Sequence, residues 1–375
     1  MVCSARVAVV GLGSVGSFAL RSLAGRCARV VGFEMAGVGG DRSAVGGDTR
    51  LFRRVYREGQ HFHDLIEESY EIWRDPNLTS PEVFVECGAL SIVPVEGRSL
   101  RTLSDYAEKF GLDYEILGRA EMARRFPQHV LRDGEVGFFD PSGGFLRTDL
   151  AVNDAVEDAC RNGAEVVNDP VSGVSTRGEA VALSVGDRVE MFDRVIVSAG
   201  AWGASLLPKL AGFSSPRRVL MTWFQARSHG FSPAAFPVFS RTIGGLNVYG
   251  APALDGRHVK ISGLVPHKEV DFAPGGLDFD SSASVEELRE AGTIVGSAMR
   301  GVSKYPVRAT GYPDLYTSDR DFLFDWVDSS RSVLVVGGLS GKGFKMSCGL
   351  GKRAARTVLE EDVLDDSFSL SRFAV

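Results

Sequence analysis

The amino-acid sequence predicts an α/β fold in which distant stretches of the chain contribute to the same sheet. Three observations lead to this prediction. A strand, glycine turn, helix and second strand fill the first forty residues, β-alternation dominates from about 219 to 265, and a second strand, glycine loop and helix follow near the end. No repeat or low-complexity linker separates these parts, so we expect interleaved domains.

Composition narrows the class of protein. The chain has 375 residues, of which 44% are hydrophobic and 24% charged, as in globular proteins with one large or two ordinary domains. The net charge of −6 argues against a general nucleic-acid-binding surface. No apolar run approaches a membrane span and no signal-peptide pattern is present. We therefore expect a cytoplasmic protein without nucleic-acid or membrane partners, as a monomer or weak homo-oligomer.

Cysteine and histidine spacing gives no metal site. The five cysteines, Cys3, Cys27, Cys87, Cys160 and Cys348, form no CxxC pair, and the six histidines form no HxxxH pattern. We expect reduced thiols and no metal ion. Glycine is in excess, with 44 residues, and only eight of the 42 basic residues are lysine. Glycines at special backbone positions and isolated lysines are therefore the residues to examine.

The first unit has the pattern of a dinucleotide-binding turn. The buried strand Val7 to Val10 runs into Gly11-Leu12-Gly13-Ser14-Val15-Gly16, a helix follows, and a second strand ends at Glu34. Glycines let the backbone approach a pyrophosphate at the helix start, and the terminal carboxylate can bind the ribose hydroxyls. The acid favours FAD or NAD over NADP, and the turn alone does not choose between them.

The segment after Glu34 favours the flavin. An NAD-binding unit normally continues with a third β/α pair. This chain instead has a loop rich in glycine and arginine, from Gly46-Gly47-Asp48-Thr49-Arg50 to Arg53 and Arg54. Such a loop suits a cofactor whose pyrophosphate and ring are covered by the chain.

The rest of the chain alternates between helical and extended patterns. We expect helices at 61–73, 100–110, 149–161 and 286–302, and strands at 164–167, 170–174 and 188–197. Near the end, a strand at 332–336 leads into Gly337-Gly338-Leu339-Ser340-Gly341-Lys342-Gly343-Phe344-Lys345 and a long helix to residue 361. This second glycine loop is another candidate for binding an anion at a helix start.

On these motifs the chain resembles the monomeric sarcosine oxidase and N-methyltryptophan oxidase family of the D-amino-acid oxidase superfamily. The resemblance also includes Ser198-Ala199-Gly200-Ala201-Trp202, Tyr249-Gly250-x-Pro252 followed by Lys260, and Leu315-Tyr316-Thr317. It implies a glutathione-reductase-like FAD-binding Rossmann domain interleaved with an α+β substrate domain built on an antiparallel sheet. The implied ranges are 1–80, 145–215 and 305–375 for the FAD domain, and 81–144 and 216–304 for the substrate domain.

The resemblance also implies a function and a set of residues. The expected activity is oxidation of a C–N bond in a secondary, cyclic or N-substituted amino acid, by hydride transfer to flavin N5 and reduction of O2 to H2O2. Lys260, Arg50 and Tyr316 are the predicted catalytic residues, and Arg53, Lys345, Tyr249 and Gly46 the predicted substrate-binding residues. The predicted cofactor-binding residues are Gly11, Gly13, Ser14, Val15, Gly16, Glu34, Thr49, Arg50, Val171, Gly200, Trp202, Gly338, Gly341, Gly343, Phe344 and Lys345.

Each of these side chains also has a structural interpretation. Arg53 could be a solvated cation in an arginine-rich loop, and Lys260 could lie on an exposed sheet face. Tyr249 and Tyr316 could be packing residues. Arg50 and Glu58 could form a structural ion pair.

Three departures from the family pattern are visible. Asp314 stands where covalent members have the cysteine that attaches the flavin, so we expect non-covalent FAD. Gly46 and Leu264 stand where sarcosine-type members have histidines, with His267 nearby, which implies a differently shaped, larger or more apolar pocket. Lys342 replaces a usual histidine in the glycine loop. The alternatives are a flavin-dependent dehydrogenase with another acceptor, a nicotinamide-dependent Rossmann dehydrogenase, and a flavin-binding protein without turnover.

Overall fold

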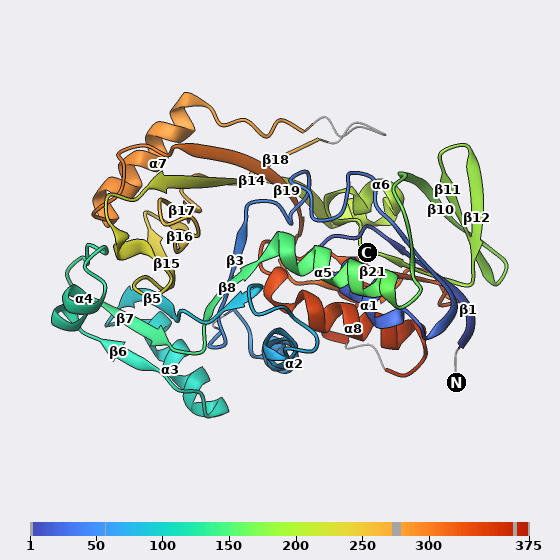
Figure 1. Cartoon of the computed structure of the whole chain (residues 1–375), viewed down its shortest axis with the longest axis horizontal. Helices are drawn as coiled ribbons and strands as arrows, with labels where there is room; N and C mark the ends of the chain where they lie inside the picture. Colours follow the sequence, from blue (N-terminus) through green and yellow to red (C-terminus); the bar gives the residue numbers. More distant parts are fainter. Residues whose placement is uncertain (1–2, 57, 272–278, 363–365, 374–375) are drawn as a thin grey trace.

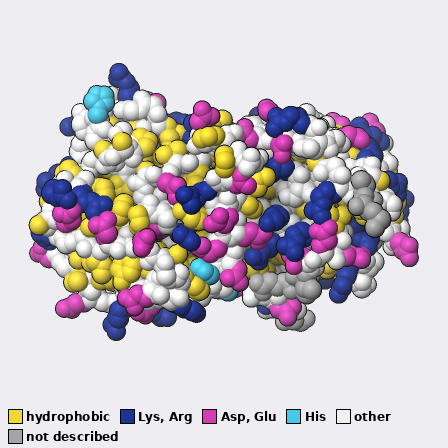
Figure 2. Space-filling view, turned by 60° about the horizontal axis from the view of Figure 1, so that its bottom comes forward, with side chains coloured by type: hydrophobic (Ala, Val, Ile, Leu, Met, Phe, Trp, Pro, Cys, Tyr) yellow, Lys and Arg dark blue, Asp and Glu magenta, His cyan; other side chains and the backbone are white. Residues whose placement is uncertain are grey.

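The computed structural model describes residues 3–56, 58–271, 279–362 and 366–373. The molecule is elongated, with one sheet and its helices at one end and a second, larger sheet at the other (Figure 1). On the face shown in Figure 2, basic and acidic side chains are interspersed, so neither sign of charge dominates there. Among the described residues, no helix is long and apolar enough to cross a membrane.

A six-stranded sheet in the order β20-β21-β13-β1-β2-β9 forms one end of the molecule. Its strands pair in parallel except β20, which runs antiparallel to β21. They come from three separate parts of the chain, as the distribution of motifs predicts. The strands are β1 (Cys3–Val10), β2 (Cys27–Phe33), β9 (Glu165–Val167), β13 (Arg194–Val197), β20 (Leu323–Trp326) and β21 (Val333–Gly337).

Both faces of this sheet are covered, which explains its uninterrupted apolar strands. Val7 and Val9 of β1 face the helices α1 (Gly16–Leu23), α2 (His63–Arg74), α5 (Thr148–Arg161) and α8 (Ser347–Val358). Ala8 and Val10, which point to the opposite face, pack toward a three-stranded sheet. Its strands are β10 (Val171–Arg177), β11 (Ala180–Val185) and β12 (Arg188–Phe192).

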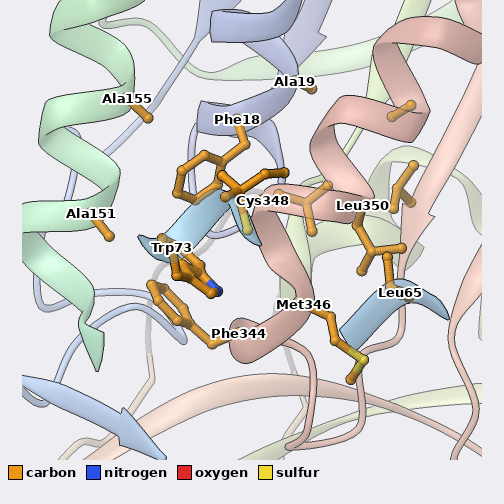
Figure 3. Close-up of a cluster of buried hydrophobic side chains, with 14 of the residues drawn as sticks. Phe18, Ala19, Leu65, Trp73, Ala151, Ala155, Phe344, Met346, Cys348 and Leu350 are labelled. Atoms are coloured by element: carbon orange, nitrogen blue, oxygen red, sulfur yellow. The ribbon is translucent and has the colours of Figure 1, made fainter. Parts of the chain in front are cut away.

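Aromatic side chains between the helices hold the second glycine loop in place. Phe18 of α1 meets Trp73 of α2 edge to face, with 5.2 Å between ring centroids, and Phe344 stacks on Trp73 (Figure 3). The indole Nε1 of Trp73 donates a hydrogen bond of 2.8 Å to the backbone oxygen of Lys345. The helix core therefore fixes where the glycine loop ends.

A nine-stranded sheet forms the other end, with the order β18-β14-β17-β16-β15-β5-β7-β6 and β19 paired to β14. Gly244 and Gly245 both have positive φ in the tight turn between β15 and β16, the geometry that two-residue hairpins require. The strands are β5 (Ala89–Pro94), β6 (Glu115–Leu117), β7 (Glu135–Asp140), β14 (Ser214–Gln225), β15 (Val238–Ile243), β16 (Leu246–Ala251), β17 (His258–Ser262), β18 (Lys268–Glu269) and β19 (Arg308–Thr317).

Three helices pack at this end and a small sheet joins it to the rest. The helices are α3 (Arg98–Phe110), α4 (Arg119–Arg125) and α7 (Val285–Ala298), and α7 begins with a capping box between Ser284 and Glu287. The small sheet contains β3 (Thr49–Phe52), β4 (Phe84–Val85) and β8 (Gly144–Arg147). The short helix α6 (Gly203–Leu206) comes after β13 in the chain. Strand β3 is part of the segment that the sequence predicted as an arginine-bearing loop. It pairs antiparallel with β8 and does not add a third parallel strand to the six-stranded sheet.

Several predicted elements differ from the structure. The strand expected at 188–197 is two strands in different sheets, because the chain turns at Asp193, whose carboxylate accepts hydrogen bonds from Arg6. The helix expected at 286–302 ends at Ala298, and the last helix ends at Val358. The larger sheet is mixed rather than purely antiparallel, since β5 and β15 pair in parallel. The domain ranges remain a prediction; β19, which they assign to the FAD domain, pairs with β14 of the substrate range.

Candidate active site

A cavity of about 620 Å³ lies where the two large sheets meet. Both glycine motifs reach it, together with the arginine loop and strands β14, β16 and β19. The predicted residues that line it are Ser14, Val15, Thr49, Arg50, Arg53, Gly200, Tyr249, Tyr316, Gly338, Gly341, Gly343, Phe344 and Lys345. The fold therefore brings together side chains that are more than 300 positions apart in the chain.

The first glycine turn has no room for a side chain at Gly11 or Gly16. Gly11 has φ +87°, and a Cβ on Gly16 would lie 1.9 Å from the backbone oxygen of Gly11. The hydroxyl of Ser198 donates to that same oxygen at 2.9 Å. The carboxylate of Glu34 accepts the N–H groups of Leu12 and Ala36, both at 3.0 Å. This packing presents the backbone of the turn and the start of α1 to the cavity, as a pyrophosphate-binding turn requires.

Three further predicted cofactor residues, Gly13, Trp202 and Val171, do not line the cavity. Gly13 lies within the turn, and a Cβ on it would lie 3.7 Å from a methyl carbon of Val45. Trp202 lies in a short 3₁₀ turn after Gly200. Val171 begins β10 and packs partly against the core on the far side of the six-stranded sheet. Their contact with a cofactor remains a prediction.

Buried cations hold the arginine loop by its backbone. Arg50 donates to the oxygens of Thr49 at 2.7 Å, of Gly46 at 2.8 Å, and of Ala44. Lys260 on β17 is 2% exposed, and its ammonium donates to the oxygens of Gly47 and Thr49, both at 2.7 Å. The interpretation of Lys260 as an exposed sheet lysine is therefore wrong. Lys260 lies behind the loop rather than on the cavity wall.

The electrostatic environment of Lys260 disfavours its charge. Burial lowers the pKa of Lys260 well below its usual value, and the neighbouring Arg50 guanidinium lowers it further. The side-chain oxygen of Thr49 is buried beside it and has no hydrogen-bond partner among the described residues. An unpaired buried hydroxyl on the cavity wall fits a site that receives a polar ligand.

A second cationic pair, Arg53 and Lys345, lies at the cavity wall. Arg53 is 9% exposed and Lys345 6% exposed, so the interpretation of Arg53 as a solvated cation is wrong. Arg53 donates to Ser240 at 3.2 Å and pairs with Glu58 at 3.0 Å. The alternative interpretation of Arg50 and Glu58 as a structural ion pair is wrong, because Glu58 pairs with Arg53 and Arg50 donates to backbone oxygens.

Lys345 is held close to Arg53 without an ion-pair partner of its own in the described chain. Its ammonium donates to the oxygen of Lys342 at 2.7 Å and to the hydroxyl of Tyr56 at 3.4 Å. Burial lowers the pKa of Lys345 to about 7, with a further contribution from Arg53 that Glu58 partly offsets. Two buried cations with one carboxylate between them form a site that attracts a further anion.

Tyr312 fills the space that Gly46 leaves. A Cβ on Gly46 would lie 2.2 Å from a ring carbon of Tyr312, and one on Gly47 would lie 2.6 Å from the sulfur of Met221. The expectation of a pocket enlarged at Gly46 is therefore wrong, because Tyr312, from β19, replaces the missing bulk. Leu264 also leaves no space, since it is 2% exposed within the apolar core of the substrate end, while His267 lines the cavity.

The position that carries the attachment cysteine in covalent relatives is a hydrogen-bonded carboxylate. Asp314 lines the cavity and accepts the N–H groups of Gly341 at 2.8 Å and Leu315 at 2.9 Å. Burial raises its pKa to about 6. Cys348 is no substitute, because it is 1% exposed among the apolar side chains between the helices (Figure 3), and burial raises its pKa to about 12.

Tyr249 and Tyr316 both line the cavity, and burial raises the pKa of each. Lys342 pairs with Asp321 at 3.0 Å.

Sequence reasoning missed Tyr312, Arg217 and Arg320, which also line the cavity. The signal for Tyr312 was available, because Tyr312, Asp314 and Tyr316 are two apart on one strand and so share a face. Among the described residues, no group of three metal-ligating side chains is found.

Comparison with known proteins identifies the family. The profile of the FAD dependent oxidoreductase family matches residues 6–357. The chain belongs to this family. It is 30% identical to the N-methyl-L-tryptophan oxidase of Shigella dysenteriae serotype 1 (strain Sd197) over 339 residues, covering 87% of this chain and 88% of that protein. The enzyme of the same name from Salmonella arizonae is 29% identical over 338 residues, with 88% of each covered.

Solved structures show the same fold. NikD, an unusual amino acid oxidase essential for nikkomycin biosynthesis, superposes with a TM-score of 0.82 at 20% identity, covering 97% of this chain and 96% of that one. The L-proline dehydrogenase of P. horikoshii superposes with a TM-score of 0.81 at 16% identity, covering 100% and 98%. The α/β architecture with mixed sheets is therefore that of this oxidoreductase family.

The low pKa of Lys345 predicts a pH-dependent cost to stability. The unfolded lysine keeps a pKa near 10.5, so the cost of burying its charge is complete below pH 7 and declines as the pH rises from 7 toward 10.5. We expect Lys345→Met to stabilise the protein at pH 6.5 by on the order of 1–3 kcal/mol, with less gain at pH 9.5. Urea unfolding at both pH values measures this difference.

The matched control is Lys352→Met on the exposed side of α8, where the lysine pairs with Glu68 at 3.1 Å and is half exposed. Its effect on stability should be the same at both pH values. An equal effect of Lys345→Met at pH 6.5 and 9.5 would contradict the buried-charge account.

Proposed function

We propose that this protein is an FAD-dependent amine oxidase that oxidises a C–N bond in an amino-acid-like substrate with a secondary, cyclic or N-substituted amine. The observation that carries the proposal is the buried pair Arg53 and Lys345, which lies on the same cavity as both glycine motifs. The guanidinium of Arg53 and the ammonium of Lys345 suit a substrate carboxylate. Membership of the FAD dependent oxidoreductase family indicates that the cofactor is FAD. The relatives named N-methyl-L-tryptophan oxidase support an N-substituted amino acid as the substrate class.

The residues present fit FAD. The crowded turn at Gly11 and Gly16 allows close backbone approach, Glu34 is oriented by two backbone N–H groups, and Thr49 offers an unpaired hydroxyl. The second loop, from Gly338 to Phe344, also lines the cavity. These features support a glutathione-reductase-like FAD domain built from 1–80, 145–215 and 305–375, interleaved with a substrate domain built from 81–144 and 216–304.

The proposed chemistry needs positioning more than acid–base groups. Bound FAD would accept a hydride at N5 from the substrate carbon and pass the electrons to O2, giving an imine and H2O2. Arg53 and Lys345 would hold the substrate carboxylate, and Tyr249 and Tyr316 would confine the substrate from strands β16 and β19. Glu58, now paired with Arg53, would have to share that cation with the substrate.

Two half-reactions test the proposed function. Anaerobic mixing of the purified yellow protein with N-methyl amino acids, or with cyclic ones such as proline, should bleach the flavin spectrum, and admitting air should restore it with release of peroxide. The matching amides, which lack the carboxylate, should bleach it at least tenfold more slowly, because one charged contact contributes about 1.4 kcal/mol or more. Bleaching that air does not reverse would indicate a dehydrogenase with another acceptor, and a protein without a flavin spectrum would exclude the proposal.

The proposed role of Lys260 concerns the oxygen half-reaction. Its nitrogen lies under the loop at Gly47 and Thr49, and its protonated form, which burial disfavours, would be favoured by the negative charge that develops on reduced oxygen and would stabilise that charge. We expect Lys260→Met to slow flavin reoxidation by at least tenfold and to leave flavin reduction nearly unchanged, as measured by stopped-flow absorbance. Equal slowing of both half-reactions would instead assign Lys260 a structural role in holding the loop.

The proposed cofactor linkage is non-covalent. Asp314 cannot form the thioether, and its carboxylate is already hydrogen-bonded to Gly341 and Leu315. Acid precipitation of the purified protein should leave all flavin in the supernatant. A yellow pellet would show that another residue is attached to the flavin.

A further inference from the structure

A second group of basic side chains lines the same cavity as Arg53 and Lys345. Arg217 is on β14, His267 precedes β18, and Arg320 is on the turn after β19. Two of them lie against one ring: the guanidinium carbon of Arg217 lies 5.2 Å from the ring centroid of Tyr316, and the imidazole centroid of His267 lies 5.5 Å from it. Arg320 also lines the cavity and is exposed.

The charge of this group is poorly compensated. Arg217 pairs with Glu269 at 3.2 Å, but the Glu269 side chain is 71% exposed, so solvent screens the pair. The Nε of Arg217 is buried and has no hydrogen-bond partner in the described structure. Arg320 forms no ion pair with any described carboxylate. The cluster therefore carries positive charge into the cavity.

Two further titratable side chains of the cavity, Asp314 and His267, do not compensate this charge through an ion pair. Asp314 lies opposite Arg217 in the pairing of β14 with β19, yet its carboxylate accepts the N–H groups of Leu315 and Gly341 instead. Burial lowers the pKa of His267, and the charges of Arg217 and Arg320 lower it further. A neutral imidazole beside two guanidinium groups can donate a hydrogen bond to an anion without adding charge.

The order of the strands separates Arg217 from Arg53, one member of the first cationic pair. Arg53 contacts Ser240 on β15, whereas Arg217 is on β14, and β17 and β16 lie between these strands. Three strand spacings correspond to roughly 14 Å between the backbones of β14 and β15. A ligand held at Arg53 and Lys345 can therefore extend toward Arg217.

We propose that Arg217 and Arg320, assisted by His267, form an anion subsite that recognises a second acidic group on the substrate. The preferred substrate is then an amino acid whose side chain or N-substituent ends in a carboxylate. This inference rests on the proposed function, because it takes the α-carboxylate to be held by Arg53 and Lys345. It makes the two arginines specificity-determining residues.

Equilibrium titration of the flavin-loaded protein tests the subsite without turnover. The probes are glutarate, adipate and pimelate, each compared with its own monoamide, and the readout is the change in the visible flavin spectrum. For at least one chain length the diacid should bind about tenfold more tightly than the monoamide, since a charged contact replaces a neutral one. Equal affinities at every length would overturn the proposal.

Variants assign the effect to the cluster. Arg217→Gln and, independently, Arg320→Gln should reduce the diacid preference to about threefold or less. Arg227→Gln, an exposed arginine just after β14 that does not line the cavity, should keep it. A preference that survives in both cluster variants would place the second anion elsewhere and contradict the assignment. If Arg217→Gln fails to fold, Arg320→Gln on the exposed turn still decides.

Turnover separates this inference from the proposed function. The N-methyl amino diacid of the chain length selected by the titration should have a kcat/KM about tenfold above that of its own side-chain amide, with most of the difference in KM. Reduction of the flavin by both compounds at equal kcat/KM would contradict the subsite and leave the amine oxidase function intact. Failure of every N-methyl and cyclic amino acid to reduce the flavin would contradict the function, and the diacid titration would still decide the subsite.

Discussion

The contact between Gly11, Gly16 and Ser198 is the constraint on which the rest of the site depends. The hydroxyl of Ser198 bonds the backbone oxygen of Gly11, and Gly16 approaches that oxygen so closely that any side chain would overlap it. This contact joins the end of β1, the start of α1 and the end of β13 at one point. Because β21 runs parallel to β13, its carboxyl end and the second glycine loop reach the same edge.

The second organising feature is a set of buried cations that bond to backbone oxygens. Arg50 and Lys260 hold the loop from Ala44 to Thr49 without using a carboxylate. Carbonyl dipoles satisfy the donors but leave the positive charge only partly balanced. The interior around the cavity is therefore electropositive, which suits a cofactor with a pyrophosphate and a substrate with a carboxylate. The pKa shifts of Lys260 and Lys345 record the cost of this arrangement.

Local patterns predicted the parts of the site that depend on neighbouring residues. The turn at Gly11 to Gly16 and the loop at Gly337 to Lys345 are each specified within about ten residues, and the structure brings both to the cavity. Contacts between distant segments could not be predicted in this way. Tyr312 packs on Gly46 although the two residues are far apart in the sequence, so Gly46 considered alone suggested an empty space. The partner of Glu58 depended on where Arg50 points, which its position in the sequence does not specify.

The burial of Cys348 has a consequence for durability. The residue lies three positions after Lys345, which lines the cavity in which the proposed reaction would release peroxide. Peroxide attacks the thiolate rather than the thiol, and burial keeps Cys348 protonated and enclosed by the helix core. The same packing of Phe18, Trp73 and Phe344 that positions the glycine loop thus shields the sulfur of Cys348 from the peroxide that the proposed reaction would form.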